Sequence, residues 1–278
     1  MKTAKNYELG AIGAHNIAKG ATHPAQRPVF TDKLEERQWA KQHMAGAFRV
    51  FGRKNYGVGA AGHISLRDPV DPHTFWINPL NKHFSLIKAS DLVHVDEECN
   101  ILPDGAQSAV NAAGFLIHAA IHKARPDVNA ACHTHLMYGK AFLTFGLPLE
   151  MINQDSCIFY GRQAVFTNFG GVALDLREGE EIAATLGPNG IAAILQNHGL
   201  LTVGDTVDEA AFLFTLMEDT CQAQLLADAA AANGLKKKII ADDVAAYTCH
   251  MTGDKESLYA EFQVDLSFEI AKGPDFLE

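Results

Sequence analysis

Helical and extended segments alternate along most of this 278-residue chain. Apolar side chains recur with helical spacing at 31–51, 109–124, 178–186 and 206–231, and short apolar runs bounded by Gly, Pro or Asn separate these segments. Such alternation is typical of domains in which helices cover a β-sheet. The pattern therefore predicts an α/β sandwich around a mixed sheet, without internal repeats.

Polar residues and glycines indicate where these elements begin and end. Thr31 and Thr206 precede helical segments and can accept hydrogen bonds from the first helical N–H groups, and Gly52 can end the first helix. The apolar stretch 191–204 is interrupted at 197–199, which predicts two strands joined by a turn. Further extended segments are expected at 63–66, 75–80, 91–102 (as a strand pair) and 127–135, with a short helix at 137–145.

The composition argues against several classes of partner. Acidic residues outnumber basic ones by 33 to 23, and the one basic run is Lys236–Lys238, so no binding to nucleic acid is expected. No run of about 18 apolar residues occurs, so no membrane span is expected. Five scattered cysteines favour a reducing, cytoplasmic location over a disulfide framework. We therefore expect the partner to be a small-molecule substrate.

Three histidines form a candidate metal site. His133 and His135 are separated by one residue in an expected strand, so both side chains point to the same face. His198 lies between Asn197 and Gly199 in the turn between two apolar strands. The alternative for His198 is an exposed turn residue. Three histidines with one open position are typical of catalytic zinc sites and also suit Fe(II) or Mn(II), so we predict one divalent ion.

Two motifs in this region resemble those of a known family. The segments "RPDVNAACHTH" at 125–135 and "LQNHGLLTVG" at 195–204, followed by a long helix beginning "DEA", are similar to the class II aldolase/adducin family. The resemblance runs over about residues 33–232 and implies a three-layer α/β/α sandwich. It also implies that His133, His135 and His198 hold a zinc, manganese or iron ion, in a homotetramer with the active site near a subunit interface.

The resemblance also divides the chain. Residues 33–232 correspond to the metal-binding domain, and residues 1–32, which show little periodicity, are expected to form an N-terminal arm. Residues 233–278 are expected to be a C-terminal extension that packs on this domain or on a neighbouring subunit.

The chain departs from the family's sugar-phosphate aldolases at their catalytic run. Those enzymes carry Ser-Ser-Glu where this sequence has Ala112, Ala113 and Gly114. Their phosphate-binding Gly-Asn corresponds to Gly62-His63, and their Thr-Gly contact falls within 78–81. The sequence therefore resembles a branch without the catalytic carboxylate and phosphate contacts. We expect Gly62, Asn78 and Gly114 to contact a substrate that carries no phosphate.

Histidines are the candidates to replace the missing carboxylate. Gly114, His118 and His122 lie four residues apart on one helix face, and Gly114 is expected to open space for substrate or water. His63 and His118 are the predicted acid/base residues, because imidazole titrates near neutral pH. His122, beside Lys123, is expected to be a surface residue.

Two further residues are candidates of a different kind. Arg67 could hold a substrate carboxylate in a bidentate contact, or it could form a surface salt bridge. Tyr160 lies in the region from which the family's aldolases bring a proton-donating tyrosine of the neighbouring subunit. Glu218 and Asp219, in the last long helix, are expected on a solvated face.

Three functions are compatible with these residues. The first is a divalent-metal-dependent lyase that cleaves a C–C bond, by decarboxylation or retro-aldol cleavage, in a small hydroxy, oxo or aromatic carboxylic acid. The second is a non-heme iron oxygenase, since the family includes one that acts on an aromatic 2-oxo acid in antibiotic biosynthesis. A non-catalytic adducin-like module is the third, and the intact histidine set argues against it.

Overall fold

The computed structural model describes residues 25–171 and 176–278, so most of the predicted N-terminal arm lies outside the described residues. Its centre is a seven-stranded mixed sheet in the order β3-β2-β1-β4-β7-β6-β5, in which only β5 and β6 pair in parallel among the described strands. The strands are β1 (His63–Arg67), β2 (Thr74–Ile77), β3 (Val93–Asp96), β4 (Ala130–Thr134), β5 (Gln163–Phe166), β6 (Ala192–Leu195) and β7 (Gly199–Gly204).

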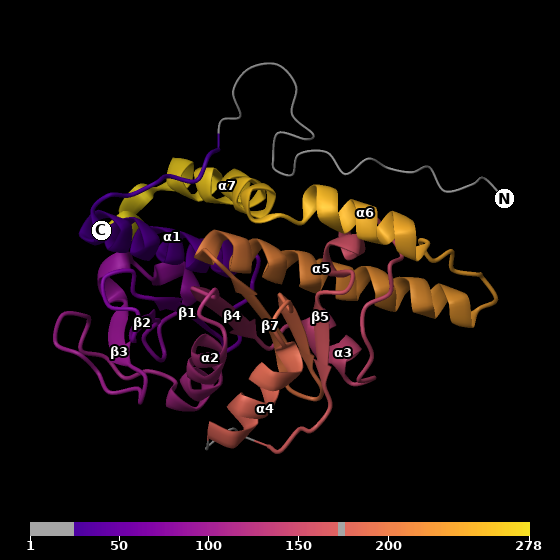
Figure 1. Ribbon diagram of the computed structural model, residues 1–278, viewed down its shortest axis with the longest axis horizontal. Helices are drawn as coiled ribbons and strands as arrows, with labels where there is room; N and C mark the ends of the chain where they lie inside the picture. Colours follow the sequence, from indigo (N-terminus) through magenta and orange to yellow (C-terminus); the bar gives the residue numbers. More distant parts are fainter. Residues whose placement is uncertain (1–24, 172–175) are drawn as a thin grey trace.

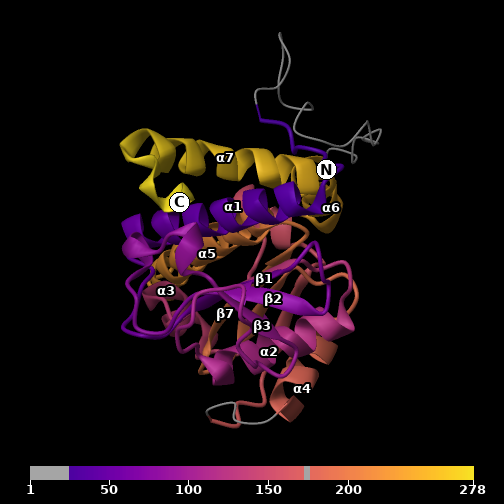
Figure 2. The ribbon, with the colours of Figure 1, turned by 90° about the vertical axis from the view of Figure 1, so that its left-hand side faces the viewer.

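Helices cover both faces of this sheet (Figure 1). One layer contains α1, α3 and α5, and the other contains α2 and α4, which confirms the three-layer α/β/α sandwich. Helices α6 and α7 lie outside the first layer, where α7 packs on α1 and α5 (Figure 2). The helices are α1 (Lys33–Arg53), α2 (Ala112–Ala124), α3 (Met137–Leu143), α4 (Leu176–Leu186), α5 (Val207–Ala232), α6 (Asp242–Thr252) and α7 (Lys255–Lys272).

The alternation of side chains along β1 separates the apolar core from the polar site. Ile64 and Leu66 point into the large core shared with α1 and α5. His63 and Ser65 point to the opposite face, where they meet α2. All four side chains are buried, so this strand joins a hydrophobic layer to a buried polar one.

Several predicted boundaries shift in the structure. Thr206 caps α5 as predicted, by accepting from the N–H of Glu209. The cap of α1 is Asp32 rather than Thr31, since its carboxylate accepts from the N–H of Leu34. The predicted second strand of 91–102 is reduced to a single bridge between Val95 and Ile101, and Pro103, which has no N–H to continue a ladder, follows soon after it.

Other elements were not predicted at all: β5, α6 and α7. The last two form most of residues 233–278, and α7 buries Leu258, Phe262 and Leu266 in the core that it shares with α1 and α5. Of the described helices, none combines the length and the apolar character that crossing a membrane requires. All five cysteines are free thiols.

Candidate active site and metal centre

The three predicted metal ligands converge in the structure. His133 is in β4, His135 follows its end, and His198 lies in the turn between β6 and β7, which pairs with β4. Each offers a ring nitrogen, and these nitrogens lie within 4.8 Å of one another. Their ring centroids are 4.8–5.1 Å apart, so three imidazoles from two chain segments surround one point.

The close approach of these segments depends on the backbone around His198. Asn197 adopts a left-handed conformation with φ 59°, which turns the chain between β6 and β7. Gly199, the first residue of β7, then lies close beside the end of β4. A Cβ atom at Gly199 would lie 2.6 Å from Cε1 of His133 and 2.9 Å from the carbonyl oxygen of Thr134. Only glycine fits there, so this residue allows His198 to reach the other two histidines.

The protonation of the triad suits a divalent cation. Nδ1 of His133 donates to the carbonyl oxygen of Leu200 at 2.9 Å, which leaves the lone pair on Nε2 free. Burial lowers the pKa of His133 and His135, and it lowers the pKa of His198 to about 4. Nδ1 of His198 is buried and finds no hydrogen-bond partner among the described residues. Neutral imidazoles with free nitrogens are what a metal ion requires, so the residues fit one.

His63 and His118 lie beside this triad. His63 is directly opposite His133 across the β1–β4 pair, and the two rings stack with centroids 5.0 Å apart. Nδ1 of His63 is 3.0 Å from Nε2 of His118, which projects from α2. A Cβ atom at Gly114 would lie 2.5 Å from Cδ2 of His63 and closer still to its Nε2. His63 itself fills the space that Gly114 leaves, so the expectation that substrate or water fills it was wrong.

His122 is not the surface residue that we expected. Its side chain is buried, because α2 turns this face toward the sheet. Its Nε2 lies 2.8 Å from Oγ of Ser65, and its Nδ1 lies 3.1 Å from the carbonyl oxygen of Val128. Ser65 was missed in the sequence, although its i, i+2 spacing from His63 places both on one face of a strand.

Gly62 directly precedes β1, and Asn78, which follows β2, contacts the start of β1. Gly62 has a φ of 99°, a conformation that favours glycine. The side chain of Asn78 is buried; its Oδ1 accepts from the N–H of Ile64 at 3.3 Å, and its Nδ2 donates to the carbonyl oxygen of Gly62 at 3.5 Å. Both residues therefore shape the backbone that carries His63. Within this chain their polar groups are engaged by the backbone.

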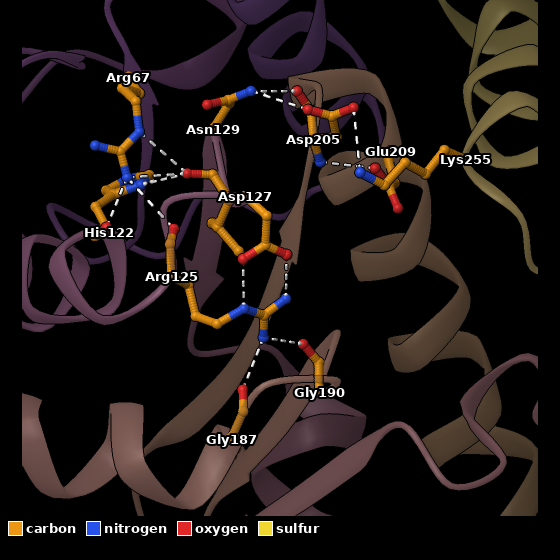
Figure 3. Close-up of polar contacts among 11 residues, drawn as sticks. Arg67, His122, Arg125, Asp127, Asn129, Gly187, Gly190, Asp205, Glu209 and Lys255 are labelled. Atoms are coloured by element: carbon orange, nitrogen blue, oxygen red, sulfur yellow. Dashed lines mark hydrogen bonds and ion pairs between the residues drawn. The ribbon is translucent and has the colours of Figure 1, made fainter. Parts of the chain in front are cut away.

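Arg67 is at the other end of β1 from His63. Its guanidinium donates to the carbonyl oxygens of His122 in α2 and of Arg125 after it (Figure 3). It also donates to the carbonyl oxygens of Val128, which precedes β4, and of Pro72. Among the described residues Arg67 forms no salt bridge, and these carbonyls engage most of the donors that a substrate carboxylate would need. Arg67 is thus separated from the triad by the length of the strand.

The structure also places Tyr160 and Glu218. Tyr160 follows the short helix Asp155–Phe159 and packs against the cluster of Met151, Cys157 and Ala245, the last of which is in α6, so this chain does not bring it to its own triad. Glu218 was expected on a solvated face but is buried, and it accepts from the N–H groups of Tyr138 at 2.9 Å and Gly139 at 2.8 Å. It anchors α3, which begins two residues after His135, and no sequence signal indicated this contact.

Comparisons with known proteins point to one family. The family model described as "Class II Aldolase and Adducin N-terminal domain" matches residues 42–225. "Decarboxylase NovR" of Streptomyces niveus is 41% identical over 90% of this chain and 91% of its own length. "4-hydroxy-3-prenylphenylpyruvate oxygenase/4-hydroxy-3-prenylbenzoate synthase" of Streptomyces roseochromogenus subsp. oscitans is 40% identical, over 91% of this chain and 88% of its own.

A solved structure extends the likeness. "L-fuculose 1-phosphate aldolase from Glaciozyma antarctica PI12" superposes with a TM-score of 0.81 at 40% identity, covering 90% of this chain and 96% of that one. Three relatives with enzyme names, each matched over most of its length, support an enzymatic role. The chain belongs to the class II aldolase and adducin family.

Proposed function

We propose that this protein is a divalent-metal-dependent lyase. Its substrate is a small, non-phosphorylated hydroxy, oxo or aromatic carboxylic acid, in which it breaks a C–C bond by decarboxylation or retro-aldol cleavage. One observation carries the proposal: Nε2 of His63 fills the space above Gly114, where the family's aldolases carry their catalytic glutamate. An imidazole beside the triad can replace that carboxylate as the group that moves a proton.

The triad of His133, His135 and His198 would hold one zinc, manganese or iron ion. A bound divalent cation acts as a Lewis acid toward a substrate oxygen and stabilises negative charge that develops there. The chain's own contribution is to keep three neutral imidazoles within reach of one another and to hold His63 against them. Glu218 supports this arrangement through the two N–H groups that begin α3.

His63 is the proposed proton-transfer residue. In a retro-aldol cleavage, Nε2 accepts the proton of the substrate's β-hydroxyl while the bond between the α and β carbons breaks. The electron pair of that bond passes to the α carbon and its carbonyl, and the same proton then returns to the α carbon. In a decarboxylation, CO₂ leaves, its bonding electrons remain on the adjacent carbon, and a proton from the site replaces it.

The absence of phosphate contacts supports a carboxylic acid as substrate. Ala112, Ala113 and Gly114 supply no hydroxyl or charge, and the polar atoms of Asn78 are engaged by the backbone. Lys140 in α3 is exposed. After burial, its positive charge is the second cause of the lowered pKa of His135, so Lys140 is a candidate contact for a substrate carboxylate. A structural relative is named for a sugar-phosphate aldolase, so L-fuculose 1-phosphate belongs in the substrate panel, and we expect no useful turnover of it.

A non-heme iron oxygenase is the second candidate. The observation that favours it is a relative with an oxygenase name that is as similar to this chain as the relative with a decarboxylase name. Three histidines accept iron as well as zinc. Oxygen uptake by the iron-loaded protein with 4-hydroxyphenylpyruvate as probe would favour the oxygenase, whereas turnover without oxygen with zinc or manganese would favour the lyase.

The protein's assembly is also part of the proposal. Met137, Phe145 and Leu147 are exposed by 69%, 60% and 55%, close after the ligand strand. An apolar surface at this place supports a homotetramer with the site near an interface, to which Tyr160 of a neighbouring copy would be added. Sedimentation equilibrium measures the assembly. Five free thiols support a cytoplasmic location.

Three variants test the proposed roles. We expect His63→Ala and His118→Ala to keep the bound metal and to lose about 10²- to 10⁴-fold in turnover. His133→Ala should lose both metal and turnover. Turnover at the wild-type level in His63→Ala would show that His63 has only a structural role. Metal loss in His118→Ala would identify His118 as a metal ligand.

A further inference from the structure

A continuous line of buried polar groups runs behind the metal triad. Nδ1 of His63 lies 3.0 Å from Nε2 of His118, and Nδ1 of His118 lies 2.7 Å from Oγ of Ser65. The same Oγ lies 2.8 Å from Nε2 of His122, whose Nδ1 lies 3.1 Å from the carbonyl oxygen of Val128. We call these five residues the histidine relay. It links the proposed proton-transfer group to a peptide carbonyl of the loop that precedes β4.

The carbonyl of Val128 fixes the direction of every hydrogen bond in the relay. A carbonyl only accepts, so Nδ1 of His122 must donate, and its Nε2 is left as an acceptor. The single proton of Ser65 Oγ must then point to His122, so Oγ accepts from Nδ1 of His118. Nε2 of His118 consequently accepts from Nδ1 of His63. Each step leaves one choice, because a hydroxyl has one proton and a neutral imidazole has one.

The burial of the three rings supports one proton on each. His63, His118 and His122 are all buried, and desolvation lowers the pKa of each, that of His122 to about 3. The ring of Phe75 stacks on His122 with centroids 4.8 Å apart, which adds an apolar wall. With one proton on each buried ring, the donor and acceptor assignments follow from the contact geometry.

We infer that the histidine relay fixes His63 as the Nδ1–H tautomer, with its Nε2 lone pair held free above Gly114. Ser65 and His122 are then positioning residues, which act through His118 on the group that faces the triad. Because a peptide carbonyl has no proton to pass on, the relay orients His63 and does not conduct protons. The catalytic consequence rests on the proposed function, whereas the tautomer does not.

The tautomers can be measured directly. ¹⁵N NMR of protein labelled with [¹⁵N]histidine distinguishes a protonated from an unprotonated ring nitrogen, and sedimented samples suit an oligomer. Spectra would be taken with and without added Zn²⁺, with each ring assigned from its own alanine variant. We expect His63, His118 and His122 each to show a protonated Nδ1 and an unprotonated Nε2. A protonated Nε2 on His63 in the wild type would overturn the inference.

Ser65→Ala tests the direction of the relay. The change removes one buried oxygen and leaves His122 still bonded to Val128. We expect His63 and His118 to become mixtures of tautomers while His122 keeps its single form. Ser156→Ala is the matched control, since Ser156 is also fully buried and its Oγ donates to a backbone carbonyl elsewhere. The control should alter none of the three rings.

A second variant, His122→Leu, removes the acceptor of the Ser65 hydroxyl proton. In His122→Leu, Ser65 Oγ has no acceptor on that side, so it can donate to Nδ1 of His118 and invert the bonds that follow. We expect His63 to show both tautomers. Unchanged tautomers at His63 in both Ser65→Ala and His122→Leu would show that neither residue positions it.

The kinetic readout separates this inference from the proposed function. If the protein turns over an acid of the proposed class, Ser65→Ala should lower kcat by about 10- to 100-fold with KM unchanged, by analogy with the loss seen when the partner that orients a metal-bound histidine is removed. Fixed tautomers without any lyase activity would support the relay and reject the function. Lyase activity in a wild-type protein whose His63 exchanges between tautomers would support the function and reject the relay.

Discussion

Replacing Gly114 with alanine tests the fit between α2 and His63. Alanine is normally preferred to glycine inside a helix by about 1 kcal/mol, so an unobstructed change would stabilise the fold. At this position the new Cβ would lie 2.5 Å from Cδ2 of His63. His63 is buried and stacked on His133, so it cannot move away without losing its 3.0 Å contact with His118.

The magnitude follows from the two contributions that this displacement adds. Overpacking costs about 1–3 kcal/mol, and leaving a buried imidazole without its partner costs about 1–3 kcal/mol. After subtraction of the helix preference, we expect Gly114→Ala to lower the free energy of unfolding by about 1–5 kcal/mol. Urea unfolding followed by the fluorescence of Trp39 and Trp76 measures this difference.

A double-mutant cycle provides the decisive comparison. In a His63→Ala background the obstruction is gone, so Gly114→Ala should stabilise the protein by about 1 kcal/mol. The sign of its effect should therefore reverse between the two backgrounds. The same effect in both backgrounds, or a Gly114→Ala protein as stable as the wild type, would refute the reasoning.

Two further predictions concern other parts of the structure. Gly199→Ala should lower Zn²⁺ affinity about 10- to 100-fold in a chelator competition, whereas Gly46→Ala, which obstructs a leucine of α7, should leave it unchanged. Burial opposes the charged form of His94, but hydrogen bonds to Asp68 and Asp104 raise its pKa overall. Its stabilising effect is complete below about pH 6.5 and is lost as pH rises through the raised pKa, so His94→Gln should flatten the dependence of stability on pH above 6.5, as urea titrations would show.

The sequence was sufficient to predict that His133, His135 and His198 lie together. His133 and His135 could be paired because strand alternation is strictly regular, and His198 stood out because a turn between apolar strands offers it no core role. The same alternation would have found Ser65 beside His63. Neither the approach of Gly199 to β4 nor the anchoring of α3 by Glu218 could be predicted, because both depend on contacts between segments distant in sequence.

The errors at α2 have one physical cause. Helical spacing placed Gly114, His118 and His122 on one face, but it did not indicate how far this face lies from the sheet. The structure packs the face against β1, so His122 is buried and His63 enters the space above Gly114. Likewise, β5 is only four residues long, and a run of that length carries little periodic signal.

The metal content of the purified protein tests the central claim most directly. Elemental analysis of wild-type protein from its native cells should find one divalent ion per chain, and parallel samples of His133→Ala, His135→Ala and His198→Ala should each lose it. His118→Ala should retain it. Wild-type protein without a stoichiometric ion, or an ion retained at full occupancy in all three triad variants, would contradict a metal centre built on these histidines.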